Sequence, residues 1–407
     1  MKMLSRTLLL VPALLAACST PPKDLDVHEL SKFVPVIPER KLSVLWGDEL
    51  NADLDQYLAN RPLLRDGQLY VSDASGTVSS YSVDSGKLNW RVRLSARFSA
   101  GPAMGEGLLL LGSSDAKVFA LDPQTGETIW ETGVSSEVLA SPLAANGRVI
   151  VRTGDGKVLG LQAASGKALW VFDRNVPLLS LRGDSTPLLV DDMVVVGFAS
   201  GKLVAMSQLD GKQIWEVSVA VPRGRSELER MVDIDGDMIY ASGLIFVASY
   251  QGRVAALAAD SGRTVWTREM SVYRNLLLDG KQLYLTDAEG QVWALDAASG
   301  ATLWKQDRLS ALASTAPVPL GDKLLVGDRL GILYWLAKTD GSLLARLPAK
   351  TVMQKSHVDE LADELDAPLH DQFWPDLMGM AHAPQVSGQR IILSYRRGVV
   401  AVLEDQP

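Results

Sequence analysis

The side chains best suited to chemistry in this chain of 407 residues are a single cysteine and four histidines. The histidines, His28, His357, His370 and His382, show none of the short spacings that are typical of metal ligands. A chain whose only thiol is Cys18 cannot form an internal disulfide or a cysteine-rich zinc site. The sequence shows no Walker-type loop and no Ser–His–Asp pattern. We therefore predict a binding protein without catalytic residues, metal or cofactor.

Cys18 follows a segment with the parts of a secretory signal peptide. Residues 1–17 carry two cations and then an apolar run of ten residues, well short of the ~20 residues that a membrane-spanning helix needs. The run ends Leu15-Ala16-Ala17-Cys18, which resembles the lipobox of bacterial lipoproteins, and Ser19 follows in place of the aspartate that favours the inner membrane. We predict removal of residues 1–17 and lipidation of Cys18, which anchors the protein to the outer membrane by lipid alone. An ordinary signal peptide with a chance cysteine is the alternative.

The composition of the remaining chain is that of an acidic, folded protein. Hydrophobic residues make up 47% of the sequence, which argues against a disordered protein. The formal net charge of −8 leaves no basic surface of the kind that nucleic acid requires. Residues 18–40 contain four prolines and predict an extended tether between the lipid and the folded body.

A glycine strand and a tryptophan strand recur together along the chain at intervals of about 40 residues. The glycine strands begin at Gly76, Gly156, Gly201, Gly252, Gly290, Gly331 and Gly398, with Ala116 in the same place of an eighth copy. The tryptophan strands contain Trp90, Trp130, Trp170, Trp215, Trp266 and Trp304, with Ala345 at the position of a seventh. Each unit offers four short apolar strands between Gly, Asp and Ser turns. Four strands per 40 residues favour a β-propeller over a sandwich or a barrel.

The two ends of the chain supply the two halves of one further unit. The last glycine strand, Gly398–Leu403, has no tryptophan strand after it, and Leu42–Trp46 is a tryptophan strand without a partner. Joining them completes an eighth blade. We predict an all-β fold, an eight-bladed β-propeller with four-stranded blades over residues 41–407, closed by the N- and C-terminal strands. The seven tryptophans in register are expected to fill the wedges between blades.

The repeat Gly-x-Val-x-Ala-Leu-Asp-x-x-Thr-Gly-x-x-x-Trp resembles that of quinoprotein dehydrogenases, and it spans residues 42–404. That repeat occurs in quinone-dependent alcohol and glucose dehydrogenases, which are enzymes, and in the BamB family of outer-membrane assembly lipoproteins, which are scaffolds. The lipobox, the length and two further segments make the chain similar to the BamB family. These segments are Leu179-Ser-Leu-Arg-Gly183, which follows Val176-Pro177, and Ser226–Asp235.

The resemblance implies a non-catalytic scaffold of the β-barrel assembly complex at the periplasmic face of the outer membrane. The scaffold would bind the POTRA domains of BamA, work beside the other subunits, and offer short strand edges to unfolded outer-membrane proteins. Carried over residue by residue, the implied contact positions are Leu179, Leu181, Arg182, Asp233 and Asp235.

The positions of both segments in the repeat agree with an interface. Each follows an outer tryptophan strand and precedes the first strand of the next blade, and such connections emerge on one face of a propeller. Leu179 and Leu181 alternate with Ser180, so their side chains are expected on the same side of an extended segment. In the alternative arrangement the two leucines pack under the rim of the propeller, and Arg182 pairs with Asp233 or Asp235 and so fixes the loops in place.

Two other functions are consistent with a propeller of this repeat. A quinoprotein dehydrogenase uses a cysteine pair or an arginine over its quinone and Ca²⁺ held by about six to eight oxygen ligands. The single cysteine is assigned to lipid, and the inner strands carry no dense acidic motif. A polysaccharide or peptidoglycan binder would instead line its channel with tryptophan and tyrosine.

Residues 348–381 are an acidic insertion in the last junction between blades. Within it, residues 356–376 hold seven acidic residues and no Lys or Arg. Val358, Leu361 and Leu365 fall at helical spacing and predict a short amphipathic helix. Blade counting places the insertion on the face of the two family-specific segments, across the ring. It is either a solvated decoration, a second partner surface or a flap over the channel mouth.

Overall fold

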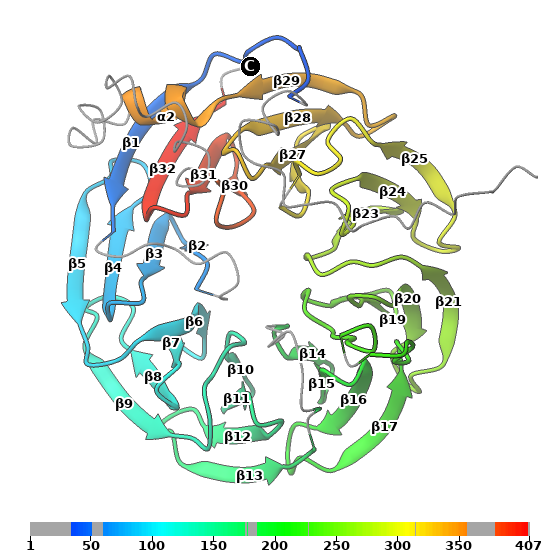
Figure 1. Cartoon of the computed structure of the whole chain (residues 1–407). Coiled ribbons are helices and arrows are strands. Elements are labelled where there is room, and N and C mark those ends of the chain that lie inside the picture. Colours follow the sequence, from blue (N-terminus) through cyan, green and yellow to red (C-terminus); the bar gives the residue numbers. More distant parts are fainter. Residues whose placement is uncertain are drawn as a thin grey trace, which may run out of the picture.

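The computed structural model describes residues 34–50, 60–175, 177, 185–226, 228–313, 315–355 and 379–405. These residues form eight four-stranded antiparallel sheets arranged as the blades of a ring around a central axis (Figure 1), where a propeller has its channel. Each blade runs from an inner strand near this axis to an outer strand at the rim. The predicted all-β, eight-bladed propeller is confirmed.

Blades 1 to 4 follow one another along the chain. Blade 1 contains β2 (Leu63–Arg65), β3 (Gln68–Ser72), β4 (Thr77–Ser82) and β5 (Leu88–Arg93), and blade 2 contains β6 (Phe98–Gly105), β7 (Leu108–Ser113), β8 (Lys117–Leu121) and β9 (Thr128–Gly133). Blade 3 contains β10 (Leu143–Ala145), β11 (Arg148–Arg152), β12 (Val158–Gln162) and β13 (Ala168–Phe172). Blade 4 contains β14 (Leu188–Val190), β15 (Met193–Gly197), β16 (Lys202–Ser207) and β17 (Gln213–Ser218).

Blades 5 to 8 complete the ring. Blade 5 contains β18 (Ile239–Ala241), β19 (Leu244–Ala248), β20 (Arg253–Ala258) and β21 (Thr264–Glu269), and blade 6 contains β22 (Leu277–Asp279), β23 (Gln282–Thr286), β24 (Val292–Asp296) and β25 (Thr302–Gln306). Blade 7 contains β26 (Val318–Leu320), β27 (Lys323–Gly327), β28 (Leu333–Ala337) and β29 (Leu343–Leu347). Blade 8 contains β30 (Gln385–Ser387), β31 (Arg390–Ser394), β32 (Val399–Glu404) and β1 (Ser43–Glu49).

Blade 8 joins the two ends of the chain, as the repeat count predicts. Its strand order is β1-β32-β31-β30, so the N-terminal strand is the outer strand of a blade whose other strands come from the C-terminus. The antiparallel register runs from Ser43 opposite Glu404 to Glu49 opposite Val399. The ring is therefore closed by hydrogen bonds between strands.

The register tryptophans hold adjacent blades together. Each indole Nε1–H donates to a backbone carbonyl in the turn of the next blade, for example Trp215 to Ala259 at 3.1 Å. The same ring covers the turn glycine of that blade, where a Cβ on Gly262 would lie 2.7 Å from a ring atom of Trp215. All seven register tryptophans make both contacts. Glycine is required at that turn because no larger residue fits under the indole.

Local turn chemistry sets the strand ends. The two-residue turns between the first and second strands have both residues at positive φ in several blades, as at Asn146 (52°) and Gly147 (73°), which is the geometry of a tight hairpin. Asp73 begins the next turn of blade 1 and its Oδ1 accepts hydrogen bonds from the backbone N–H of Ser75 (2.9 Å) and Thr77 (3.1 Å). Asp287 and Asp328 repeat this arrangement in blades 6 and 7.

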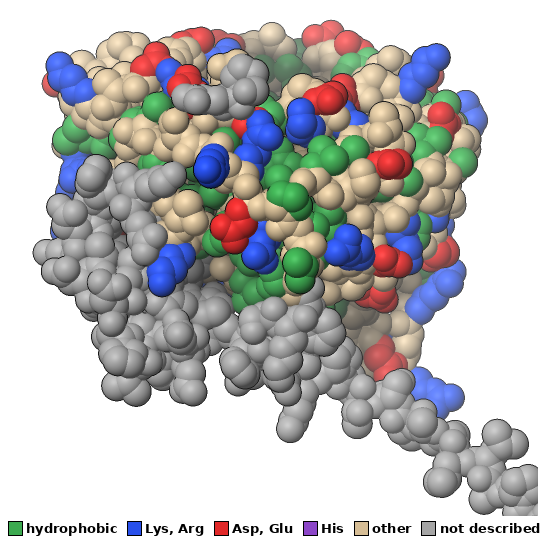
Figure 2. Space-filling view, turned by 90° about the horizontal axis from the view of Figure 1, so that it is seen from above, with side chains coloured by type: hydrophobic (Ala, Val, Ile, Leu, Met, Phe, Trp, Pro, Cys, Tyr) green, Lys and Arg blue, Asp and Glu red, His purple; other side chains and the backbone are tan. Residues whose placement is uncertain are grey.

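Two segments lie against the outside of the ring. Residues 38–40, assigned by the sequence to the end of the tether, run beside β29, and a parallel bridge joins Glu39 to Arg346. The helix α2 (Ala349–Lys355) opens the insertion and contacts β1, while the residues expected to form an amphipathic helix fall outside the described part. Figure 2 shows the rim on the β29 side, where charged and apolar side chains are mixed. Among the described helices none is long and apolar enough to cross a membrane.

Candidate partner-binding site

Four of the six residues predicted for binding or lipidation lie outside the described part of the chain. They are Cys18, Leu179, Leu181 and Arg182. The structure does describe both ends of the connection that contains the last three, and all but one residue of the connection that contains Asp233 and Asp235. These two connections, residues 173–187 and 219–238, are called here the first and second junction loops.

The start of the first junction loop is fastened to blade 4 by a charge cluster. The Arg174 guanidinium donates to both carboxylate oxygens of Glu216, at 2.8 and 3.0 Å, and Lys202 Nζ lies 2.6 Å from the same carboxylate. These hydrogen bonds, that of Arg174 foremost, lower the pKa of Glu216 to about 2. Arg174 also covers the Phe198 ring, with 5.4 Å between the guanidinium carbon and the ring centroid. The loop therefore leaves the rim from a fixed point.

The tip of the second junction loop is a structured turn. The Ser226 hydroxyl accepts from the Glu229 N–H at 3.2 Å, and the Glu229 carboxylate accepts from the N–H groups of Arg225 (2.6 Å) and Ser226 (3.4 Å), which is the reciprocal pattern of a capping box. These backbone hydrogen bonds lower the pKa of Glu229. Gly224, with φ +140°, passes so close that a Cβ would lie 2.3 Å from the Cβ of Glu229. The turn presents Leu228 with 64% of its surface exposed.

The two aspartates predicted as contacts follow this turn in the chain and are buried. Asp233 has no exposed surface and Asp235 is 8% exposed. The Asp233 carboxylate accepts a hydrogen bond from the N–H of Ile234 at 2.8 Å. The backbone carbonyl of Asp233 accepts one from the N–H of Tyr250, also at 2.8 Å. A side chain without exposed surface does not touch a partner in this conformation. The pairing with Arg182 in the loop-pinning alternative lies outside the described residues.

The structure brings the two junction loops together. The backbone N–H of Thr186, at the end of the first loop, donates to Oδ1 of Asp237, at the end of the second, at 2.8 Å. Ser185 and Ile234 also meet over Gly197 in blade 4, where a Cβ would lie 2.6 Å from Ile234 Cγ2 and 3.1 Å from Ser185 Oγ. Segments about fifty residues apart in sequence thus end at the same place.

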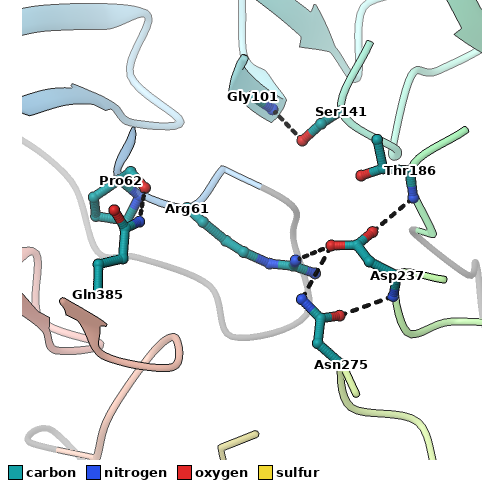
Figure 3. A network of polar contacts seen from close by, with 8 residues as sticks. All are labelled: Arg61, Pro62, Gly101, Ser141, Thr186, Asp237, Asn275 and Gln385. Atoms are coloured by element: carbon teal, nitrogen blue, oxygen red, sulfur yellow. Dashed lines mark hydrogen bonds and ion pairs between the residues drawn. The ribbon is translucent and has the colours of Figure 1, made fainter. Parts of the chain in front are cut away.

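Asp237 is also the centre of a network at the mouth of the channel (Figure 3). Arg61, which precedes blade 1, reaches across the channel and places Nη1 2.8 Å from Asp237 Oδ2. Asn275 of the next junction donates to the same oxygen at 3.0 Å and accepts from the Asp237 N–H at 2.9 Å. Burial opposes ionisation of Asp237, but the Arg61 charge and the hydrogen bonds from Thr186 lower its pKa. The second junction loop is therefore held by three other connections, those that lead into blades 1, 4 and 6.

Arg61, Asp237 and Asn275 were not predicted from the sequence. Each stands two residues before an inner strand, as Ser141 and Thr186 do. This shared position could have indicated that the residues lie near one another, because equivalent positions in the blades of a propeller face the same axis. The residue type varies at that position, so a search for a repeated letter does not find it.

Three features of the described residues bear on the alternative functions. No group of three His, Cys, Asp or Glu side chains suited to a metal ion occurs within the described residues. Arg61, which lies at the channel mouth, is paired with Asp237. In the seven inner strands of three residues, Tyr240 is the one aromatic residue, so these strands do not form an aromatic-lined channel.

Comparison with known proteins identifies the family. The family model described as outer membrane protein assembly factor BamB matches residues 74–306 and 289–373. The chain belongs to the BamB family. The BamB of Alkalilimnicola ehrlichii is 45% identical over 285 residues, which cover 70% of this chain and 74% of the relative. The BamB of Kangiella koreensis is 33% identical over 408 residues, which cover 98% and 95% of the two chains.

Solved structures agree with this family assignment. The crystal structure of BamB from Moraxella catarrhalis matches with a TM-score of 0.76 at 25% identity, covering 90% of this chain and all of the other. A quinohemoprotein alcohol dehydrogenase from Pseudomonas putida matches with a TM-score of 0.67 at 14% identity, covering 89% of this chain and 76% of the enzyme. The second likeness shows the shared fold alone. The predicted resemblance to the BamB family is confirmed.

Proposed function

We propose that this chain is a non-catalytic accessory factor in the assembly of outer-membrane proteins, and that it binds the periplasmic POTRA domains of BamA through its two junction loops. The observation that carries the proposal is the hydrogen bond from Thr186 to Asp237, which fastens two adjacent loops to each other on a rigid ring. Loops held in place by a β scaffold are common binding elements. Membership of the BamB family supports the choice of partner.

The proposal divides the site residues into contacts and supports. Leu179, Leu181 and Arg182 are proposed to touch the partner, since two leucines beside an arginine form the kind of anchor that interfaces use. Asp233 and Asp235 are proposed to support the second loop from beneath, because both are buried. The exposed tip of that loop adds apolar surface, with Leu228 64% and Val221 53% exposed, and basic side chains at Arg223 and Arg225.

The anchor is proposed as a lipid. Removal of residues 1–17 would leave Cys18 as the first residue, carrying acyl chains in the periplasmic leaflet of the outer membrane. Residues 19–33 would then lead to the segment at 34–40 that lies on blade 7. Replacing Cys18 with Ala should release the protein from membranes, which fractionation would measure, and continued membrane attachment would contradict a lipid-only anchor.

Capture of purified POTRA domains tests the interface. The bait is the chain from residue 19 onward, since all eight blades close within residues 43–404. Arg182→Glu reverses one charge in the first junction loop and should reduce capture about tenfold or more. Lys281→Glu is the matched control, an exposed charge reversal at a hairpin turn on the opposite face. Equal capture by wild type and Arg182→Glu would show that the first junction loop is not the interface.

A further inference from the structure

Several outer strands of the blades share a pattern, from which β13 departs at one position. In five of them the residue before the register tryptophan is aliphatic and about half exposed, at Ile129, Leu169, Ile214, Val265 and Leu303. In four of these five the residue after the tryptophan is polar or charged, at Glu131, Glu216, Thr267 and Lys305. Charged side chains on an exposed edge strand prevent unintended pairing with other strands. In β13 this position is Val171, which is 55% exposed.

The result is an exposed edge without charge. β13 reads Ala-Leu-Trp-Val-Phe over Ala168–Phe172 and carries no ionisable residue. It stands at the end of the strand order β10-β11-β12-β13 and lies on the rim of the ring (Figure 1). Leu169 and Val171, 48% and 55% exposed, are two residues apart and so lie on the same face. The edge therefore offers backbone hydrogen-bonding groups beside two neighbouring aliphatic side chains.

An outer edge of this same ring already accepts an added segment. Beside β29, the N–H of Arg40 donates to the carbonyl of Arg346 at 2.8 Å, and the N–H of Arg346 donates to the carbonyl of Pro38 at 3.0 Å. Arg346 follows the register position of blade 7, and the added segment places Glu39 against it, with 3.2 Å between guanidinium and carboxylate. Arg346, the residue after the register position in blade 7, is thus paired with a residue of opposite charge on the added segment.

The same arrangement at blade 3 calls for an apolar complement. Val171 occupies the position that Arg346 occupies in blade 7, so a segment added to β13 would place an apolar residue there. Leu169, two residues earlier on the same face, would take a second apolar residue two positions along the added strand. The occupant that fits is an extended polypeptide with apolar residues at alternate positions.

We propose that the edge of β13 binds such a segment of another, unfolded protein by adding it as a fifth strand of blade 3. The inference rests on the proposed function in outer-membrane protein assembly, because strands of membrane β-barrels alternate apolar and polar residues. Backbone hydrogen bonds supply affinity in this mode of recognition, and the alternate side chains supply selectivity. β13 ends at Phe172, directly before the first junction loop, and includes none of the loop residues proposed for the POTRA domains.

Fluorescence anisotropy with a synthetic peptide tests the proposal. The probe is a labelled ten-residue peptide of alternating valine and threonine with a lysine at each end, added to the chain from residue 19 onward. Val171→Lys restores a charge to the edge and should weaken binding by about tenfold or more. Thr267→Lys at the same position of blade 5 is the matched control and should leave the affinity unchanged.

Two N-methylated peptides test whether the backbone pairs. Methyl groups on the amides of one strand edge should abolish binding to the wild-type protein, while methyl groups on the amides of the other edge should not. Absence of binding by the wild-type protein, equal binding by Val171→Lys, or tolerance of both methylation patterns would overturn the proposal. Capture of POTRA domains by Val171→Lys in the same preparation separates this failure from failure of the proposed function.

Discussion

Asp237 is the residue on which the candidate site depends most. It accepts from Thr186, pairs with Arg61 and exchanges hydrogen bonds with Asn275, so groups from three other connections between blades meet at one carboxylate. Its side chain is 30% exposed, as is that of Arg61. Water therefore screens the ion pair in part, and its effect on stability is that of a half-buried pair.

The pKa of Asp237 predicts how its contribution to stability changes with pH. Because the folded-state pKa lies below the ordinary value of about 3.9, the ionised carboxylate stabilises the fold above that pH, and this stabilisation is lost as the pH falls through the folded pKa. Asp237→Asn should lower the free energy of unfolding by about 1 kcal/mol at pH 7. The difference between the two proteins should shrink steadily below pH 4, as measured by denaturant unfolding. A difference that stays constant down to pH 3 would contradict ionic stabilisation by Asp237.

At the scale of elements, the unit of construction is a tryptophan packed on the next blade's glycine. Trp215 is 8% exposed, donates to the Ala259 carbonyl and covers Gly262. Because the contact joins two blades, its loss affects the seam between them and not a single sheet.

Replacing Trp215 with Ala should lower the free energy of unfolding by about 3–5 kcal/mol, since it removes an indole from between two blades and leaves a cavity. Thermal or denaturant unfolding measures this. Leu209→Ala is the control. Leu209 lies in the turn before β17 and its side chain is 68% exposed, so the substitution should change stability little. If the two variants were equally stable, the indole would not fill the wedge between the blades.

For the tip of the second junction loop, we predict a substitution that weakens partner binding and leaves the stability of the fold nearly unchanged. Gly224→Ala forces a Cβ into Glu229 and should disrupt the capping box at Ser226. Since the turn is exposed, the melting temperature should change little, while the Kd for POTRA domains should rise about five- to tenfold through loss of preorganisation. Gly243→Ala is the matched control, a positive-φ glycine with open space around its Cβ. An unchanged Kd for Gly224→Ala would exclude the turn from the interface.

At the scale of the whole molecule, the periodic features could be predicted and the singular ones could not. The ring, its eight blades and its closure by Leu42–Trp46 and Gly398–Leu403 follow from a repeat that occurs many times. The Arg61–Asp237 pair joins blades 1 and 5 across the channel, and one contact between residues so far apart in sequence leaves no periodic signal.

Burial of single residues was equally hard to predict. Asp233 and Asp235 alternate with apolar residues in the sequence, and this alternation does not distinguish exposed aspartates from buried ones. Their burial is a tertiary effect, as the hydrogen bond from the Tyr250 N–H to the Asp233 backbone carbonyl shows. Pairing of residues 38–40 with β29 is likewise a tertiary contact, and the prolines of that segment indicated only an extended chain.

Hydrogen exchange of the chain with and without the POTRA domains of BamA tests the central claim most directly. Both junction loops lie at one end of adjacent blades, so binding there should slow amide exchange within residues 173–187 and 219–238 together. Exchange in the hairpin turns of the opposite face, such as Asn146–Gly147, should stay the same. Exchange that remains unchanged in both loops at saturating POTRA concentration, or that slows only on the opposite face, would contradict the account.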